Sequence, residues 1–385
     1  MLLPITLPVL TNIKTLAHTP LTTFQCTEVD IQQYIQKLDE GEPAAFDALV
    51  KCNSQAVPAL IKTLSETQNE DTYIITIAAL GEIGVNAAPA IPILNELLLN
   101  ELLQHNNEDV RIVAAVALRK IGGKIGVEAI PVLISTFDDA DIIVRYRAVG
   151  ILEEIGKEAI PALISALNDP DSDVRSIAAD ALREMGTEAK EAIPALISAL
   201  DDPDSDVRIS AAFALGGMGT EAKEAIPALI SALDDPDSDV RFRVAFALGG
   251  MGTEAKEAIP ALISALDDPD SDVRSRVAFT LGGMGTEAKE AIPALISALD
   301  DPDSDVRSRV ASALGEMGTE AKEAIPALIS ALDDPDSDVR FRVASALGGM
   351  GTEAKEVIPA LVSALNNPDS DVRISAASAL GEMGT

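Results

Sequence analysis

Residues 224–256 read EAIPALISALDDPDSDVRFRVAFALGGMGTEAK, a 33-residue block that decides the fold. The block is written almost verbatim five times between Glu191 and Thr352, and degenerate copies lie on both sides. A fixed period of this length is typical of a solenoid, in which each unit buries its apolar face only against its neighbours. The sequence therefore predicts an extended array of repeated units.

Each block contains two stretches with the period of an α-helix. In the first stretch of the quoted copy, the apolar residues Ile226, Leu229, Ile230 and Leu233 are spaced to form one helical face. Pro227 fits in the first turn of this helix, because its missing N–H group would have no partner there. The pattern predicts a short amphipathic helix.

The second stretch follows the acidic run DDPDSD. We expect Asp237 to be the N-cap of a second helix, because its carboxylate can accept hydrogen bonds from the first-turn N–H groups. Gly252 is expected to end this helix in the left-handed conformation that a C-cap commonly needs. A turn over Thr220–Lys223 would lead into the first helix. The apolar stripe of the second helix is Val240, Val244, Ala245, Leu248 and Met251.

The composition limits the classes of partner. The 385 residues are 47% hydrophobic but only 3% aromatic, which predicts a helical core of Ala, Leu, Ile and Val. The formal net charge of −33 repels nucleic acid and anionic lipid. We therefore expect no nucleic-acid partner and no membrane partner.

The cysteines and the apolar segments bear on the compartment. Cys26 and Cys52 lie outside the regular array, so disulfides cannot hold that array together, and a reducing, cytoplasmic setting is the simplest expectation. The longest apolar region, Ala87–Leu103, is broken by prolines and polar residues, so no membrane-spanning segment is predicted. The N-terminal segment lacks a basic stretch and a small-residue cleavage site, which argues against a signal peptide.

The chain is expected to contain about ten helix pairs in an all-α, right-handed solenoid. Near the N-terminus, Thr27 and Asp30 resemble a capping box that opens a helix over Glu28–Leu38, and Ala44–Lys51 resembles a second helix. The predicted regions are an irregular segment at 1–26, a capping helix pair at 27–53, degenerate repeats at 54–156 and regular repeats at 157–385.

The last unit ends with Ala376, Leu380 and Met383 still carrying the interior pattern. Solenoids normally finish with a polar capping unit. Three alternatives stay open: the open end is tolerated, it pairs end to end with another chain, or the natural protein continues past Thr385.

The run L-x-D-x-D-x-x-V-R-x-x-A-x-x-A-L-G, seen here from Leu233 to Gly249, resembles the HEAT-like repeat. In particular it resembles the short version found in phycobilin (phycobilisome) lyase subunits, and the resemblance covers roughly residues 28–385. In that family an Asp and the Arg six residues later form a ladder between stacked units. The resemblance therefore implies a ladder of Asp202/Arg208, Asp235/Arg241, Asp268/Arg274, Asp301/Arg307 and Asp334/Arg340.

Catalytic and metal-binding roles find little support. Asp202, Asp204 and Asp206 are spaced like Ca²⁺ ligands, but Val207 and Phe213 stand where an EF-hand loop needs Gly and a carboxylate. Helix capping and pairing with arginine explain these acids without a metal. The two histidines belong to no metal-spaced motif. We expect no metal, no cofactor and no catalytic residue.

The positions that differ between copies indicate a binding face. They lie one, two, five and nine residues after the Val-Arg arginine on the second helix. Stacked in register, the first three would align aromatic rings beside arginines. In helical-pair solenoids this helix usually lines the concave surface. Phe and Arg are enriched at interface centres, although the rings could instead fill gaps between helices. The candidate residues are Phe213, Phe242, Arg243, Phe246, Arg276, Phe279, Arg309, Phe341 and Arg342, with Tyr146 and Arg147 in an earlier unit.

The expected function is a non-catalytic scaffold that binds a protein partner on this concave face. The resemblance implies an alternative, a phycobilin lyase-like or phycobilisome assembly or turnover protein that handles a tetrapyrrole. In that alternative, Arg243 and Arg276 would bind the propionates and Phe246 would stack on the pigment.

Overall fold

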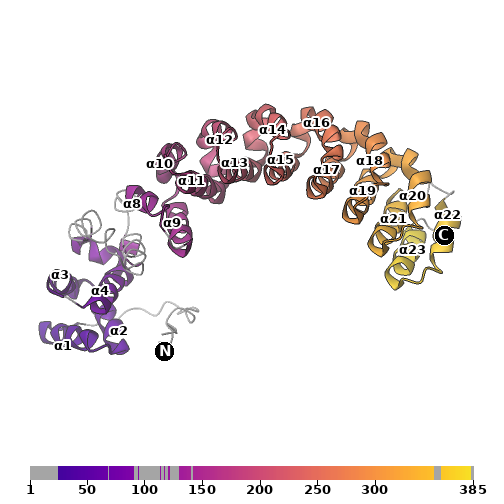
Figure 1. Cartoon of the computed structure of the whole chain (residues 1–385). Helices are drawn as coiled ribbons and strands as arrows, with labels where there is room; N and C mark the ends of the chain where they lie inside the picture. Colours follow the sequence, from indigo (N-terminus) through magenta and orange to yellow (C-terminus); the bar gives the residue numbers. More distant parts are fainter. Residues whose placement is uncertain are drawn as a thin grey trace, which may run out of the picture. The chain divides into compact units, whose positions relative to one another are not determined.

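The computed structural model describes residues 25–67, 69–90, 94, 113, 117, 120–121, 130–139, 142–350 and 357–382. Every regular element in these ranges is a helix, and they contain no β-strand. The contacts divide the chain into two compact units, residues 1–125 and 126–385. The expected all-α solenoid of stacked helix pairs is confirmed (Figure 1).

The first unit opens with the expected capping pair. Thr27 and Asp30 form the capping box: the Asp30 N–H donates to the Thr27 hydroxyl at 3.2 Å, and the Thr27 N–H donates to Asp30 Oδ2 at 2.9 Å. The helices of this pair extend slightly beyond the predicted bounds, and both pack against the pair that follows. The elements are α1 (Glu28–Asp39), α2 (Pro43–Cys52), α3 (Val57–Glu66) and α4 (Glu70–Ile83), with 3₁₀ helices η1 (Asn53–Gln55) and η2 (Gly84–Ala90).

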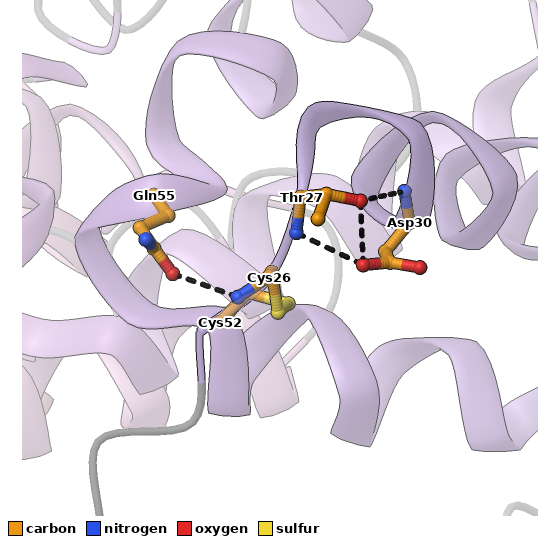
Figure 2. The surroundings of a disulfide bond; sticks show 5 residues. All are labelled: Cys26, Thr27, Asp30, Cys52 and Gln55. Carbon is orange, nitrogen blue, oxygen red and sulfur yellow. Dashed lines mark hydrogen bonds between the residues drawn. A yellow bond between two sulfur atoms is a disulfide. The ribbon is translucent and has the colours of Figure 1, made fainter.

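A disulfide joins Cys26, just before α1, to Cys52 at the end of α2 (Figure 2). The Cys26 N–H also donates to Gln55 Oε1 at 3.0 Å, so the segment that enters α1 is tied to the exit of α2 twice. The bond lies outside the regular repeats, as expected from the positions of the two cysteines. The irregular segment predicted at residues 1–26 lies almost entirely outside the described residues.

One described segment, Asp71–Ala90, is long and apolar enough by composition to cross a membrane, with a mean hydropathy of 1.3. This segment comprises most of α4 and all of η2, and 44% of it is buried inside the structure. Thr72, Thr76, Ile77 and Leu80 lie in the interior of the first unit, where α4 packs against α2 and α3. A core helix of a solenoid has the same composition. Most of the predicted apolar region Ala87–Leu103 lies outside the described residues.

The second unit is a run of helix pairs arranged in two layers, with the first helix of each pair in one layer and the second helix in the other (Figure 1). A 3₁₀ helix joins most pairs. The first helices are α8 (Ile130–Ser135), α10 (Ile160–Ala166), α12 (Ile193–Ala199), α14 (Ile226–Ala232), α16 (Ile259–Ser264), α18 (Ile292–Ala298), α20 (Ile325–Ala331) and α22 (Ile358–Ala364). The second helices are α9 (Ile142–Ile155), α11 (Ser172–Met185), α13 (Ser205–Gly217), α15 (Ser238–Gly250), α17 (Ser271–Gly283), α19 (Ser304–Met317), α21 (Ser337–Gly349) and α23 (Ser370–Glu382).

The predicted apolar stripes form the core. Leu229 of α14 and Val240, Val244 and Leu248 of α15 are completely buried, and their equivalents in other repeats are buried in the same way. Asp237 is the N-cap of α15, and its carboxylate accepts a hydrogen bond from the Asp239 N–H at 2.8 Å. Each repeat thus buries an aliphatic face between helices whose starts are capped by aspartate.

Two details between the helices differ from the predictions. The segment expected to be a turn over Thr220–Lys223 is part of a 3₁₀ helix, η6 (Gly219–Ala225). Gly252 has the expected positive φ, 56°. At the equivalent Gly186 and Gly318, however, ψ is −132° and −129°, which is not the left-handed helical region but its extended counterpart, a region that only glycine enters easily.

Glycine also lets the second helices approach closely. A Cβ added to Gly216 would lie 2.7 Å from the Cα of Ala247 on the next second helix, and one added to Gly282 would lie 2.7 Å from the Cα of Ala313. Only a hydrogen atom fits in this space. The first glycine of each Gly-Gly pair therefore sets the spacing of the layer that carries the candidate site.

Candidate functional site

The arginine of each Val-Arg pair bridges two neighbouring repeats. Arg241 forms a bidentate pair with Asp268 of the next repeat, with Nε 2.6 Å from Oδ2 and Nη2 2.8 Å from Oδ1. The Arg241 and Asp268 side chains are only 11% and 7% exposed, an environment in which charge-assisted hydrogen bonds are strong. The same pairing recurs in Arg175–Asp202, Arg208–Asp235, Arg274–Asp301 and Arg307–Asp334.

The pairing implied by the family resemblance is wrong in one respect. Arg241 contacts Asp235, six residues earlier, only through the backbone carbonyl, to which Nη1 donates at 2.8 Å. The Asp235 carboxylate is occupied by Arg208 of the preceding repeat and by the N–H of Asp237 at 2.9 Å. Each paired ladder arginine therefore binds the aspartate of the next repeat. The ladder pairs join neighbouring repeats and do not form within a single repeat.

The ladder extends beyond the predicted residues at one end and stops at the other. Arg175, which the sequence interpretation omitted, pairs with Asp202, although Asp169 stands six residues before it in the same motif. At the position where other repeats carry the aspartate that pairs with the preceding arginine, the repeat after Arg340 carries Asn367. Arg340 donates only to the carbonyls of Asp334 and Pro335, at 2.8 and 3.0 Å, and its buried Nε has no hydrogen-bond partner among the described residues.

The ladder perturbs the acids that it contains. Burial by itself would raise the pKa of Asp268, but hydrogen bonds from Arg241 and from the Asp270 N–H outweigh burial and lower it. The hydrogen bonds that Arg241 donates to Asp268 in turn raise the pKa of Arg241. Asp202, Asp301 and Asp334 have lowered pKa values for the same reasons. The ladder is thus a set of charged, mutually satisfied pairs with a structural role.

The aspartates of the DDPDSD loops are used in the same way. The Asp204 carboxylate accepts from the Asp206 N–H at 2.9 Å, and the Asp202 carboxylate accepts from the Asp204 N–H at 2.9 Å. Among the described residues, no group of three or more His, Cys, Asp or Glu side chains is placed to hold a metal ion.

A second set of arginines lies on the second helices beside phenylalanines. We call this set the Phe/Arg row. Arg243 lies with its Cζ 4.3 Å from the centroid of the Phe213 ring, and Arg276 lies 4.6 Å from Phe242 and 5.3 Å from Phe246. These distances are typical of cation–π contacts. The row comprises Phe213, Phe242, Arg243, Phe246, Arg276, Phe279, Arg309, Phe341 and Arg342, from α13, α15, α17, α19 and α21.

The contacts of the row cross from one repeat to the next. The Phe213 and Phe246 rings meet edge to face with centroids 5.6 Å apart. Arg309 lies 5.2 Å from the Phe279 ring of the preceding repeat, and Arg342 lies 5.4 Å from Phe341 within its own repeat. The structure therefore brings most of the predicted residues together as one continuous strip.

The arginines of the row are not neutralised. Among the described residues, no carboxylate forms an ion pair with Arg243, Arg276, Arg309 or Arg342, and the buried Nε atoms of Arg243 and Arg276 have no hydrogen-bond partner. Burial, followed by the charges of Arg309 and Arg243, lowers the pKa of Arg276. Burial and the charge of Arg183 likewise lower the pKa of Arg243, although Asp239 and Asp180 oppose this shift. Positive charge is thus concentrated along the Phe/Arg row, whereas the net charge of the whole chain is −33.

The rings of the row are neither core nor fully exposed. Phe279 is 43% exposed, whereas Phe213, Phe242, Phe246 and Phe341 are half-buried. The alternative in which the rings complete the core therefore fits poorly, because the interior of these repeats is filled by the aliphatic stripes. A shallow pocket of about 330 Å³ opens on the strip, lined by Ile209, Asp239, Phe242, Arg243 and Asp272.

The earlier units contribute differently from the prediction. Tyr146 of α9 is 58% exposed and is not in contact with the row, and the side chain of Arg147 lies outside the described residues. Arg183 of α11, which the sequence interpretation missed, lies 4.6 Å from the Phe213 ring. A signal was present, because Arg183 occupies the position at which the regular repeats carry the first glycine of the Gly-Gly pair.

Solved structures resemble the chain in fold. The karyopherin Kap121p bound to the SUMO protease Ulp1p aligns with a TM-score of 0.70 at 15% identity, covering 92% of this chain and 45% of the karyopherin. Kap121p bound to the C-terminus of the phosphatase Cdc14p aligns with a TM-score of 0.68 at 16% identity, covering 93% and 46%. The YibA protein of E. coli aligns with a TM-score of 0.50 at 22% identity, covering 66% of this chain and 91% of YibA. The chain thus spans about half the length of the karyopherins that it matches.

A comparison with curated protein sequences finds no match. The model of HEAT repeats matches residues 130–209, 193–262, 259–348 and 325–385, which together are more than half of the chain. No lyase family is assigned, so only the repeat part of the expected resemblance is supported. From these matches and the stacked helix pairs, the chain belongs to the HEAT-repeat family.

Proposed function

We propose that the chain is a non-catalytic scaffold that binds a protein partner along the Phe/Arg row. HEAT-repeat solenoids typically mediate protein interactions. One observation carries the proposal: Arg243 and Arg276 stack on phenylalanine rings with buried Nε atoms that have no partner among the described residues. An unpaired polar group costs free energy, so a partner that brings a hydrogen-bond acceptor to these two guanidinium groups would bind favourably.

The geometry favours a protein over a small ligand. The row crosses five second helices, a length suited to a polypeptide rather than to a single pocket. Arg and aromatic residues are the side chains most often found at the energetic centres of interfaces. The rigid stacking of repeats means that the surface is formed before binding, so that little conformational entropy is lost on association.

The test is affinity capture from native lysate with wild-type bait and with a Phe246→Ser/Phe279→Ser bait, analysed by mass spectrometry. We expect the variant to lose the partner while its melting temperature falls only slightly. The matched control is Val29→Ser/Val85→Ser, which also removes two exposed apolar side chains, 66% and 70% exposed, far from the row in sequence. A partner captured equally by all three baits would overturn the proposal. A large loss of thermal stability in the Phe variant would assign the rings to the core.

A tetrapyrrole is the second candidate ligand. The observation that favours it is the 330 Å³ pocket, where Arg243 and Phe242 could bind a propionate and a ring. The pocket is at the low end of the range for small-molecule sites, about 300–1,000 Å³, and the row continues well beyond it. Phycocyanobilin mixed with the protein should show a shifted visible spectrum and retained pigment if this candidate is right.

Two further expectations stay proposals. The exposed side chains Val362 of α22, Leu365 just after α22 and Ile374 of α23 support self-association through this helix pair. Strictly monomeric light scattering at high concentration would overturn it. A cytoplasmic location is also proposed, although a Cys26–Cys52 disulfide is more typical of an oxidising compartment. Mass spectrometry of protein alkylated at the moment of lysis distinguishes the two settings, since free thiols are expected in the cytoplasm.

A further inference from the structure

The arginines of the Phe/Arg row have a regular spacing because each comes from the same position of a different repeat. Arg243, Arg276 and Arg309 follow one another at intervals of 33 residues, on α15, α17 and α19. Packed helices lie about 8–10 Å apart, and the second helices that carry these arginines are in direct contact. The row thus presents one guanidinium about every 9 Å.

This spacing matches a particular backbone conformation of an extended polypeptide. In a polyproline II helix, every third side chain points in the same direction, and three residues span about 9.3 Å. In a β-strand, the side chains on one face are about 6.8 Å apart, so they would fall out of register with the row after one or two repeats. An extended segment with one acceptor in every three residues would meet each arginine in turn.

Resting on the proposed function, we propose that the partner contributes an extended acidic segment, with a carboxylate at every third residue, whose acids pair with Arg243, Arg276 and Arg309. We choose carboxylates because their negative charge complements the positive guanidinium groups. These guanidinium groups have no ion-pair partner among the described residues, whereas the ladder arginines beside them are each satisfied by an aspartate. The small side chains between the acids would lie over the half-buried ring of Phe246 and the exposed ring of Phe279.

The electrostatic surroundings restrict the segment to the row. Asp239 and Asp272, four residues before Arg243 and Arg276, are exposed at the helix N-termini, one turn away along each helix. Burial is the main cause of the lowered pKa of Arg276, and the positive charges of Arg309 and Arg243 lower it further. An acidic segment is therefore attracted over the arginines and repelled by the aspartates on one side.

The same observations disfavour a nucleic acid. An arginine lies over the Phe213 ring and another over the Phe242 ring, so each of these rings has one face less on which a base could stack. A nucleic acid also carries a charge on every nucleotide, and the chain itself carries −33, whereas the acidic segment brings only one charge per repeat.

The test uses three fluorescein-labelled synthetic peptides and the full chain. The first peptide is a twelve-residue Glu-Pro-Ala repeat, the second has the same composition with its four glutamates contiguous, and the third has Gln in place of Glu. In fluorescence anisotropy at low salt, the spaced peptide is expected to bind at least tenfold more tightly than either control. Equal binding of the spaced and contiguous peptides would overturn the register, and absence of binding by the spaced peptide would overturn the proposal.

Matched protein variants separate the row from general charge. Arg243→Gln/Arg276→Gln/Arg309→Gln is expected to abolish binding of the spaced peptide. Lys223→Gln/Lys256→Gln/Lys289→Gln removes the same charge from exposed lysines of the 3₁₀ helices and should change the affinity by less than twofold. Equal loss in the two variants would overturn the assignment to the row. Replacing the three arginines with lysine should weaken binding, because lysine lacks the planar, stacked guanidinium.

The outcome also distinguishes this inference from the proposed function. Failure of the spaced peptide, with lysate capture still dependent on Phe246 and Phe279, would overturn the acidic segment alone. Loss of that dependence would overturn the binding face. Tighter binding of a single-stranded oligonucleotide than of the peptide would replace the protein segment with a nucleic acid.

Discussion

The carboxylate of Asp268 performs two structural tasks through its contacts with Arg241 and with its own loop. It accepts two hydrogen bonds from Arg241 of the preceding repeat, at 2.6 and 2.8 Å, and one from the Asp270 N–H at 2.9 Å. The side chain thus fixes the stacking of two repeats and the start of a helix. In a solenoid, stability depends on such nearest-neighbour contacts, so the ladder is the natural place to test the fold.

Removing the aspartate of one ladder pair, here called a rung, should destabilise the array. Asp268→Ala leaves the guanidinium of Arg241 nearly buried without a carboxylate, which costs about 3 kcal/mol in the free energy of unfolding. The measurement is urea denaturation followed by circular dichroism. Asp267→Ala is the control, because it removes the same charge from an exposed neighbour. A loss below 1 kcal/mol for Asp268→Ala would show that water satisfies the arginine instead.

Adding an aspartate to pair with Arg340 should stabilise the C-terminal end of the ladder. Asn367 occupies the repeat position of the aspartate that would pair with Arg340, and the Nε of Arg340 is buried without a partner among the described residues. Asn367→Asp supplies the carboxylate and is expected to raise the free energy of unfolding by about 1.5–3 kcal/mol, the typical gain for a hydrogen bond to a charged group. Asn366→Asp, at an exposed neighbouring position, adds the same charge and should have no such effect. Equal effects of the two substitutions would contradict the pairing.

The ladder predicts the direction of acid sensitivity. Asp202, Asp268, Asp301 and Asp334 have lowered pKa values in the folded chain. Their contribution is therefore complete above the unfolded pKa of about 3.9, and it is lost as the pH falls through the lower folded values. The stability difference between wild type and Asp268→Asn should be constant from pH 7 to pH 5 and shrink below about pH 4. A difference that persists at pH 2 would mean that the rung does not depend on ionisation.

Much of this architecture follows from the sequence because each repeat is specified locally. The apolar spacing of Val240, Val244 and Leu248 requires a buried helical face, and Asp237 can cap only the helix that follows it. Near-identical copies also made the variable positions visible, and the structure brings Phe213, Arg243 and Phe246 together as expected. Whether these residues bind a partner stays a prediction.

The parts that were missed depend on contacts between repeats. The partner of Arg241 could not be chosen from the sequence, since Asp235 and Asp268 stand at equivalent positions and only the stacking decides between them. Arg183 lies beside Phe213 because of the same stacking. The conformation of Gly186 and Gly318 depends on the direction in which the chain leaves each second helix, which no local pattern specifies.

The disulfide should contribute to the stability of the first unit. Cys26 and Cys52 are 26 residues apart, and closing a loop of this size restricts the unfolded chain by about 3 kcal/mol in the chain-entropy treatment. Reduction, or Cys26→Ser/Cys52→Ser, is expected to loosen α1 and α2 while the regular repeats stay protected. Hydrogen exchange read by mass spectrometry measures both regions in one experiment. Unchanged protection of Glu28–Asp39 after reduction would show that packing and the Thr27–Asp30 capping box suffice.

Adjacent glycines in one Gly-Gly pair should respond in opposite directions. A Cβ on Gly282 would lie 2.7 Å from the backbone of Ala313, so Gly282→Ala must push two second helices apart, at a cost of about 1–3 kcal/mol. A Cβ on Gly283 meets nothing within 4 Å, so Gly283→Ala should instead stabilise by up to about 1 kcal/mol through helix propensity. Urea denaturation of the two single variants gives the sign directly. If both substitutions stabilise, the second helices are not in the close contact described, and the spacing of about 9 Å on which the acidic-segment inference depends must be larger.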